Sequence, residues 1–167
     1  RGDPLSHEYT YDISMFRDTF ETRFTYLNGF LRNVSRFGSR PALFDPHSGR
    51  RWTYRELNAE ANRLAHALRA DGVGKNDVVM FTLLNSPEFV FCYLAAHKIG
   101  AVACPVNYRQ GAGEIALVID DSTPKAFIYD AEFGELSGGA LDLCESKPAI
   151  KIVVGADDAV PAGQVRY

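Results

Sequence analysis

Apolar side chains near the start of the chain recur at steps of three and four residues, the spacing of one face of a helix. They are Ile13, Phe16, Phe20, Phe24, Leu27, Leu31 and Val34. The pattern predicts one or two amphipathic helices ending near residues 37–38, with Gly38 as the C-cap. Because arginines and acids are mixed on the polar face, we expect packing against the domain rather than a membrane-lying helix. The first twelve residues are polar and predict no regular element.

A β-hairpin and a capped helix are predicted next. Two short extended segments, 41–44 and 51–53, flank a turn sequence rich in Pro, Ser and Gly. Thr53 and Glu56 have the spacing of a capping box, in which each side chain accepts the other residue's backbone N–H. The apolar residues behind this cap share one helical face: Leu57, Ala61, Leu64, Ala65 and Leu68.

From residue 78 onwards, apolar strand-like runs alternate with helical segments. The runs cover 78–84, 101–104, 125–129 and 150–154, and the helical segments cover 88–99, 114–121 and 140–145. Continuous apolar runs are typical of parallel strands that are buried on both faces. Strand starts about 24 residues apart match successive strand–helix units with right-handed crossovers. The sequence therefore predicts a three-layer α/β fold, a mostly parallel sheet flanked by helices.

Composition and charge exclude some classes of protein. The 167 residues contain 18 Lys and Arg and 21 Asp and Glu, a net charge of −3 with the histidines neutral. This balance argues against a nucleic-acid-binding protein. No apolar stretch reaches the ~18 residues of a membrane span, and the first residues do not match a signal peptide. We therefore expect a cytoplasmic protein without a membrane span.

The cysteines and histidines do not match a metal-binding pattern. Cys92, Cys104 and Cys144 are widely spaced, as are the four histidines. Reduced, buried thiols are therefore expected. Catalytic templates such as G-x-S-x-G, H-E-x-x-H and the phosphate-binding P-loop do not occur in the sequence. We assign neither catalytic residues nor metal ligands.

Candidate binding residues lie where the predicted strands end, because open parallel sheets bind ligands beyond their carboxyl ends. The segments there are Asn85-Ser86, residues 105–109, Asp130 and Gly155. Arg109 is the cation of this rim, and its guanidinium can offer a phosphate a fork of donors. The alternative is an ordinary solvated arginine. Asn85 comes just before a predicted helix, so we expect it to be the N-cap.

A dinucleotide site is one alternative function. Residues 111–116 match G-x-G-x-x-A, open a predicted helix and precede a strand that ends in Asp130. However, six residues, 105–110, separate Gly111 from the preceding strand, which would misdirect the backbone amides. A stand-alone NAD- or FAD-binding module and a non-catalytic interaction domain are both kept as alternatives.

Five motifs in register resemble the opening of the adenylate-forming acid:CoA ligases. They are Thr53-Tyr54-Arg55-Glu56-Leu57, Gly72-Val73-Gly74-Lys75-Asn76-Asp77-Val78-Val79, Asn85-Ser86-Pro87-Glu88-Phe89, Ala95-Ala96-His97-Lys98-Ile99-Gly100-Ala101-Val102 and Pro105-Val106-Asn107-Tyr108-Arg109. The resemblance covers about residues 24–130. The last motif is more similar to fatty-acyl and related CoA ligases than to peptide-synthetase adenylation domains, which tend to have Asp where Asn107 stands.

The resemblance implies a two-step reaction. A carboxylate attacks the α-phosphate of ATP with the help of Mg²⁺, and coenzyme A then displaces AMP from the acyl-adenylate to form a thioester. It also implies that Asn107 and Tyr108 lie near the coenzyme A nucleotide and that Arg109 contacts a coenzyme A phosphate. The family's ATP- and Mg²⁺-binding motifs and its C-terminal lysine come later than Tyr167. The chain is therefore expected to be an inactive N-terminal fragment that holds no cofactor tightly.

The resemblance also implies a domain organisation and partners. We expect a partly helical N-terminal extension, 1–23, and an α/β subdomain, 24–167, which is an incomplete part of a larger ligase N-terminal domain. The expected partners are the rest of the ligase chain and a small-molecule carboxylic acid, with a fatty acid favoured. Because the sheet should pack on a following subdomain, we expect an exposed apolar face and a homodimer formed through it.

Overall fold

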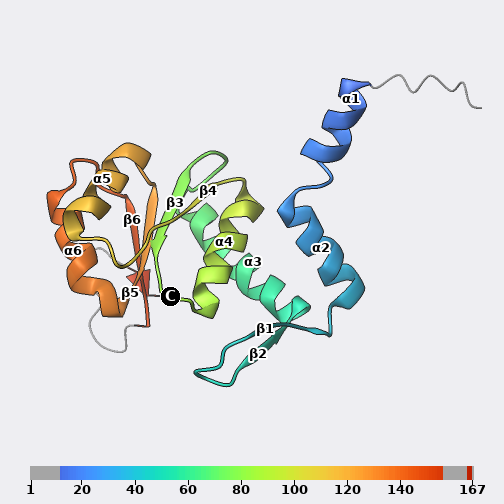
Figure 1. Ribbon diagram of the computed structural model, residues 1–167, viewed down its shortest axis with the longest axis horizontal. Coiled ribbons are helices and arrows are strands. Elements are labelled where there is room, and N and C mark those ends of the chain that lie inside the picture. The colour runs from blue at the N-terminus through green and yellow to red at the C-terminus, as the bar shows by residue number, and fades with distance from the viewer. Residues whose placement is uncertain (1–11, 156–164, 167) are drawn as a thin grey trace, which may run out of the picture.

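A computed structural model describes residues 12–155 and 165–166 (Figure 1). The helices are α1 (Ile13–Phe16), the π-helical turn η1 (Arg17–Glu21), α2 (Tyr26–Phe37), α3 (Tyr54–Ala70), α4 (Pro87–Ile99), α5 (Ala112–Ser122), the 3₁₀ turn η2 (Ala131–Phe133) and α6 (Gly134–Leu143). The strands are β1 (Pro41–Phe44), β2 (Arg51–Thr53), β3 (Val78–Thr82), β4 (Val102–Pro105), β5 (Ala126–Asp130), β6 (Ile150–Val154) and β7 (Val165–Arg166).

Five strands form a parallel sheet in the order β4-β3-β5-β6-β7. From β3 the chain crosses to β4 at the edge and then returns past β3 to β5, so the topology switches direction around β3. Helices α3 and α4 cover one face of the sheet, and α5 and α6 cover the other (Figure 1). The predicted three-layer α/β fold and its four parallel strands are confirmed. Strand β7 was not predicted.

Burial on both faces explains why the sequence of the central strand β3 is apolar without interruption. Val79 and Phe81 belong to the core cluster beneath α3 and α4, whereas Met80 belongs to the cluster beneath α5 and α6. All three side chains are fully buried. Because successive side chains of a strand point to opposite faces, a sheet covered on both sides requires apolar residues at every position.

The β-hairpin and the capped helix form as predicted. β1 and β2 pair antiparallel. At the start of α3, the N–H of Thr53 donates to Glu56 Oε2 at 2.8 Å, and the N–H of Glu56 donates to Thr53 Oγ1 at 3.3 Å. The apolar face of α3 packs into the core, with Leu64 and Leu68 almost fully buried. The capping box thus begins a helix that the core then holds in place.

Two local predictions are wrong. Helix α6 spans Gly134–Leu143 rather than about 140–145, because a buried face that already includes Ser137, ahead of Ala140 and Leu141, outweighs the low helix propensity of its glycines. The N-cap of α4 is Ser86 and not Asn85, which is exposed. The fixed φ of Pro87 suits the first helical position, so the helix begins there without a side-chain cap.

The expected packing of the N-terminal helices holds for α2 only. Phe30 of α2 is buried in the core. In contrast, α1 and η1 project away from the domain, and Ile13 and Phe20 are more than half exposed (Figure 1). Thr25 separates the two parts, because its extended backbone and its side-chain bond to the N–H of Asn28 start a new helix. We call residues 12–25 the arm.

An ion pair closes the amino edge of the sheet. Asp77 Oδ2 lies 3.0 Å from Lys125 Nζ and accepts the N–H of Gly74 at 2.8 Å. Lys125 Nζ also donates to the carbonyl of Gly72 at 2.6 Å. The hydrogen bond from Gly74, followed by the contact with Lys125, lowers the pKa of the Asp77 carboxyl.

This ion pair makes the free energy of unfolding depend on pH. Since the pKa of Asp77 is lower in the folded than in the unfolded chain, its stabilising effect is present above the unfolded pKa of about 3.9 and is lost as the pH falls further. We expect the free energy of unfolding to drop less between neutral pH and pH ~3 in Asp77→Asn than in the wild type. Urea unfolding at both pH values measures this drop. An unchanged drop in Asp77→Asn would refute the prediction, and Asp142→Asn, at an exposed position on α6, is the matched control.

Candidate functional site

The loop after β4 is held in a defined turn by its own asparagine. Asn107 Oδ1 accepts the N–H of Arg109 at 3.0 Å, and the Asn107 carbonyl accepts the N–H of Gln110 at 3.1 Å. This is an Asx-type turn, in which an asparagine side chain replaces a backbone acceptor. The Asn107 oxygen is therefore committed to shaping the loop, and the Arg109 side chain extends from it into solvent.

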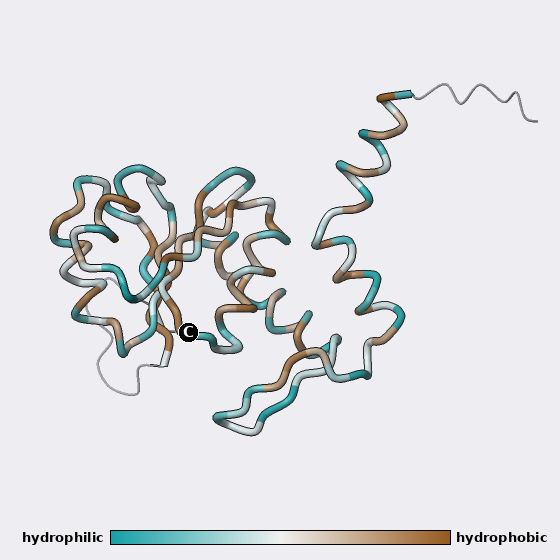
Figure 2. Tube along the Cα trace, viewed as in Figure 1, coloured by the Kyte–Doolittle hydropathy of each residue, from teal (hydrophilic) through white to brown (hydrophobic). Residues whose placement is uncertain are grey.

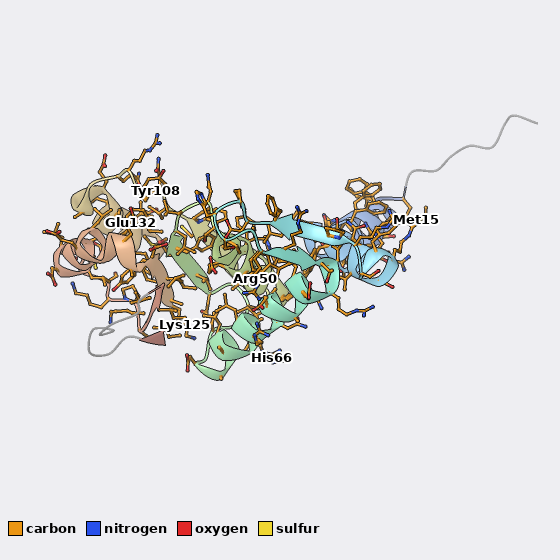
Figure 3. The ribbon with its side chains drawn as sticks, turned by 90° about the horizontal axis from the view of Figure 1, so that it is seen from below. Met15, Arg50, His66, Tyr108, Lys125 and Glu132 are labelled. Carbon is orange, nitrogen blue, oxygen red and sulfur yellow. The ribbon has the colours of Figure 1, made fainter. Side chains whose placement is uncertain are left out.

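Aromatic stacking connects this loop to the next strand end. The ring of Tyr108 lies 5.0 Å from that of Phe133, which is in η2 after β5, and the planes differ by only 8°. The Arg109 guanidinium lies 5.7 Å from the centre of the Tyr108 ring. Figure 3 shows Tyr108 and Glu132, a neighbour of Phe133, at the same end of the molecule. The loops after β4 and β5 therefore meet beside β3, where the topology switches direction.

Tyr108 also borders a cleft of about 500 Å³ at this edge. The cleft is lined from the β1–β2 hairpin by Asp45, His47, Ser48, Arg50 and Trp52, and from the turn between β3 and α4 by Leu84, Asn85, Ser86, Pro87 and Glu88. The predicted rim residues Asn85 and Tyr108 are thus brought together. The side of the cleft formed by the β1–β2 hairpin, which we call the hairpin wall, was not predicted. The stacking of Phe133 on Tyr108 was not predicted either.

Two charged groups of the cleft, Asp45 and Arg50, are already paired. Asp45 accepts hydrogen bonds from Ser48 Oγ and from the N–H groups of His47 and Ser48, and these bonds lower its pKa, the one from the Ser48 side chain most. The Arg50 guanidinium lies 4.6 Å from the centre of the Trp52 ring and 3.8 Å from a Glu60 oxygen. The cleft can therefore bind a ligand, and its Asp45 and Arg50 side chains are held in place by their neighbours.

The start of α5 is unfavourable for the phosphate binding that the dinucleotide alternative requires. Glu114 Oε2 accepts the N–H of Gly111 at 2.8 Å, so a carboxylate of the chain already caps this amide and places negative charge beside it. Asp130, the candidate ribose ligand, accepts the N–H of Glu132 at 3.0 Å and caps η2. Gly155 lies just beyond β6 with a left-handed φ of 78°.

The cysteines are free thiols. Cys92 and Cys144 are buried, and Cys104 is half-buried. Burial raises the pKa of the Cys92 and Cys104 thiols, which keeps them protonated and poorly nucleophilic. Within residues 12–155 and 165–166, no three His, Cys, Asp or Glu residues come together as a metal site. Over the same residues, no helix is both long and apolar enough to cross a membrane.

The chain is similar in sequence to a known enzyme family and to several known proteins. A family model described as AMP-binding enzyme matches residues 30–166. The 3-hydroxybenzoate/4-hydroxybenzoate–CoA ligase of Thauera aromatica is 44% identical over 107 residues, which are 64% of this chain and 20% of that protein. The long-chain-fatty-acid–CoA ligase FadD13 of Mycobacterium tuberculosis is 42% identical over 90 residues, 54% of this chain and 18% of that protein. These matches span about a fifth of each relative's length.

Solved structures show the same fold. The anthranilate CoA ligase AuaEII, solved with anthranoyl-AMP, superposes with a TM-score of 0.76 at 25% identity, over 83% of this chain and 26% of that one. The N-terminal domain of FACL13 from Mycobacterium tuberculosis, solved with an inhibitor, gives a TM-score of 0.68 at 28% identity, over 83% and 32% of the two chains. The sheet and the loop containing Arg109 lie inside the family match, whereas the arm lies before it.

Proposed function

The chain belongs to the AMP-binding enzyme family, and on that premise we propose that it is part of an AMP-forming acid:CoA ligase. Such a ligase activates a carboxylic acid as an acyl-adenylate and then transfers the acyl group to coenzyme A. The similarity to CoA ligases for hydroxybenzoates and for long-chain fatty acids supports this proposal. The substrate we propose is a small carboxylic acid, and both aromatic and fatty acids are represented among these relatives.

We propose that the loop of Asn107, Tyr108 and Arg109 contacts the nucleotide of coenzyme A. The observation that carries this assignment is that a hydrogen-bonded turn and a stacked tyrosine present Arg109 at the carboxyl edge of the sheet, where open α/β sheets bind ligands. Asn107 holds the turn, and Tyr108 is braced by Phe133. The Arg109 guanidinium is exposed and can offer a phosphate two parallel N–H donors.

The adenylation step needs groups that these residues do not supply. Mg²⁺ would neutralise charge on the reacting phosphate, but the described residues contain no cluster of acidic or imidazole ligands to hold it. We therefore propose that the ATP- and Mg²⁺-binding groups come from the part of a ligase that this chain does not match. On this proposal residues 1–23 are an extension, residues 24–167 are an incomplete α/β subdomain, and the ligase acts in the cytoplasm.

Isotope exchange between ATP and pyrophosphate tests the proposed function, because it reports acyl-adenylate formation alone. We expect no carboxylate-dependent exchange from the 167-residue chain, and clear exchange from a polypeptide that also carries the remaining four-fifths of a ligase's length. The longer polypeptide without added acid is the control. Exchange catalysed by the 167-residue chain, or none by the longer polypeptide across a panel of aromatic and fatty acids, would reject the proposal.

A further inference from the structure

A small pocket lies at the amino edge of the sheet, between α2 and the C-terminal ends of α3 and α4. Both α3 and α4 end just before a strand of the parallel sheet begins, so this edge is opposite to the one that carries Arg109. Figure 3 shows His66, which lines the pocket, well apart from Tyr108. The pocket is therefore separate from the proposed coenzyme A contact.

Three basic side chains and one amide line this pocket. Asn62, His66 and Arg69 lie on the same face of α3, at steps of four and three residues, and Lys98 comes from the last turn of α4. Among the described residues, none that lines the pocket is acidic. Because the whole chain has a net charge of −3, this concentration of positive charge is a local feature. We call the site the basic pocket.

The basic side chains of the pocket lack a carboxylate partner. In the described part of the chain, none of the three forms an ion pair. The ammonium group of Lys98 donates to Asn58 Oδ1 at 2.7 Å and lies 5.8 Å from the centre of the Phe30 ring, and both of these partners are neutral. Partial burial lowers the pKa of Lys98. A bound anion would supply the negative charge that the chain does not place here.

Helix dipoles offset only part of this positive charge. The C-terminal ends of α3 and α4 each carry about −0.5 elementary charge, so the arginine and the lysine of the pocket leave an excess of about one positive charge even with the histidine neutral. The last turns are also closed by the chain itself. The Leu68 carbonyl accepts the N–H of Val73 at 2.8 Å, and the Ala96 carbonyl accepts the N–H of Ala101 at 2.9 Å. These two carbonyls are therefore not free to repel an anion.

The rest of the lining is apolar and comes from all three helices: Leu27, Leu31, Ala65 and Ile99. Figure 2 shows hydrophobic and hydrophilic positions intermingled along α2 and α3. The volume of about 270 Å³ is below the ~300–1,000 Å³ of pockets for drug-sized ligands, so the pocket suits a smaller molecule. Two positive charges favour a dianion over a monoanion, and the fork of an arginine matches phosphate oxygens.

We propose that the basic pocket binds a phosphate monoester with a small apolar group. Arg69 and Lys98 bind the phosphate oxygens, the Asn62 amide donates to one of them, and the apolar side chains contact the organic group. The site is additional to the proposed coenzyme A contact and does not depend on the ligase function. Because the ligand would contact α2, α3 and α4 together, its binding would also stabilise the folded chain.

Isothermal titration calorimetry of the 167-residue chain with phenyl phosphate tests this site. We expect saturable binding of one molecule per chain, and competition by inorganic phosphate. Benzoate, which has the same ring but a single negative charge, should bind more weakly. Arg69→Gln and Lys98→Gln should each raise the dissociation constant for phenyl phosphate about tenfold, as for the loss of a hydrogen bond between charged groups.

Two control variants make this result specific to the pocket. Arg36→Gln removes an exposed arginine from the last turn of α2, outside the pocket lining, and should bind phenyl phosphate as the wild type does. Arg109→Ala should also bind it normally, which separates this site from the proposed coenzyme A contact. Far-UV circular dichroism verifies that each variant is folded.

Three kinds of result would overturn the proposal. One is the absence of saturable binding at roughly millimolar phenyl phosphate, the range of a weak small ligand. Another is binding that Arg69→Gln and Lys98→Gln leave unchanged, or that Arg36→Gln weakens equally, since overall charge would then be its cause. The third is binding to phosphatidylcholine vesicles that contain phosphatidic acid, without binding of phenyl phosphate, because the basic residues would then contact a lipid headgroup.

Discussion

Truncating Phe81 to alanine is expected to lower the free energy of unfolding by about 3–5 kcal/mol. Phe81 is fully buried in β3, the strand at which the topology switches. Its ring meets those of Phe89 and Tyr93 edge-on, at 5.1 Å and 6.1 Å between centres. The alanine variant would leave a cavity beneath α4. Domains are typically stable by only 5–15 kcal/mol, so this loss is a large part of the total.

Urea unfolding, followed by Trp52 fluorescence and far-UV circular dichroism, measures the loss. Phe44→Ala is the control, because Phe44 lies on β1 with its side chain 49% exposed. Its effect should stay below about 1 kcal/mol. If the two variants lost equal stability, the core around β3 would not be the main source of stability.

Replacing Arg109 by alanine, in a ligase that contains this chain, is expected to raise the KM for coenzyme A about tenfold. A hydrogen bond to a charged group contributes about 1.5–3 kcal/mol, and each 1.4 kcal/mol is a factor of ten. We expect the lower end because Arg109 is exposed. Steady-state thioester synthesis with varied coenzyme A gives the KM.

Two further variants make this result specific. Arg109→Lys keeps the charge but loses the planar fork of donors, so it should recover only part of the affinity. Arg69→Ala removes an exposed arginine from the last turn of α3 and should leave the KM unchanged. A similar rise in Arg69→Ala would mean that overall charge, rather than the loop, attracts coenzyme A.

Local patterns predicted most of the fold. The unbroken apolar run of β3 indicated a strand buried on both faces, and Thr53 and Glu56 marked the start of α3, which forms as expected. The packing of the arm against the domain was mispredicted because the apolar spacing continues across Thr25, whose extended backbone separates the arm from α2. Periodicity identifies an apolar face, but it does not tell what covers that face.

The candidate site was predicted in part. Residues 107–109 directly follow a predicted parallel strand, so their position at the sheet edge could be predicted from the sequence alone. Phe133 could not be found in this way, because its stacking with Tyr108 depends on how the loops after β4 and β5 meet. The hairpin wall depends on the edge-on contact of Trp52 with Phe91, which is 5.8 Å between ring centres.

One signal against the dinucleotide alternative was present in the sequence. Glu114 stands three residues after Gly111, the spacing at which a glutamate reaches back to the first amide of a helix. In the structure it does so. A glycine motif that includes its own capping carboxylate is therefore a poor candidate for phosphate binding.

The most direct test of the central claim, that this sheet edge serves the coenzyme A step, compares the two half-reactions in Arg109→Ala ligase. ATP–pyrophosphate exchange reports adenylation, and thioester formation at limiting coenzyme A reports transfer. The account predicts exchange at the wild-type rate and thioester formation slowed about tenfold, in line with the expected loss of a charged hydrogen bond. Exchange slowed as much as thioester formation, or neither slowed, would contradict it.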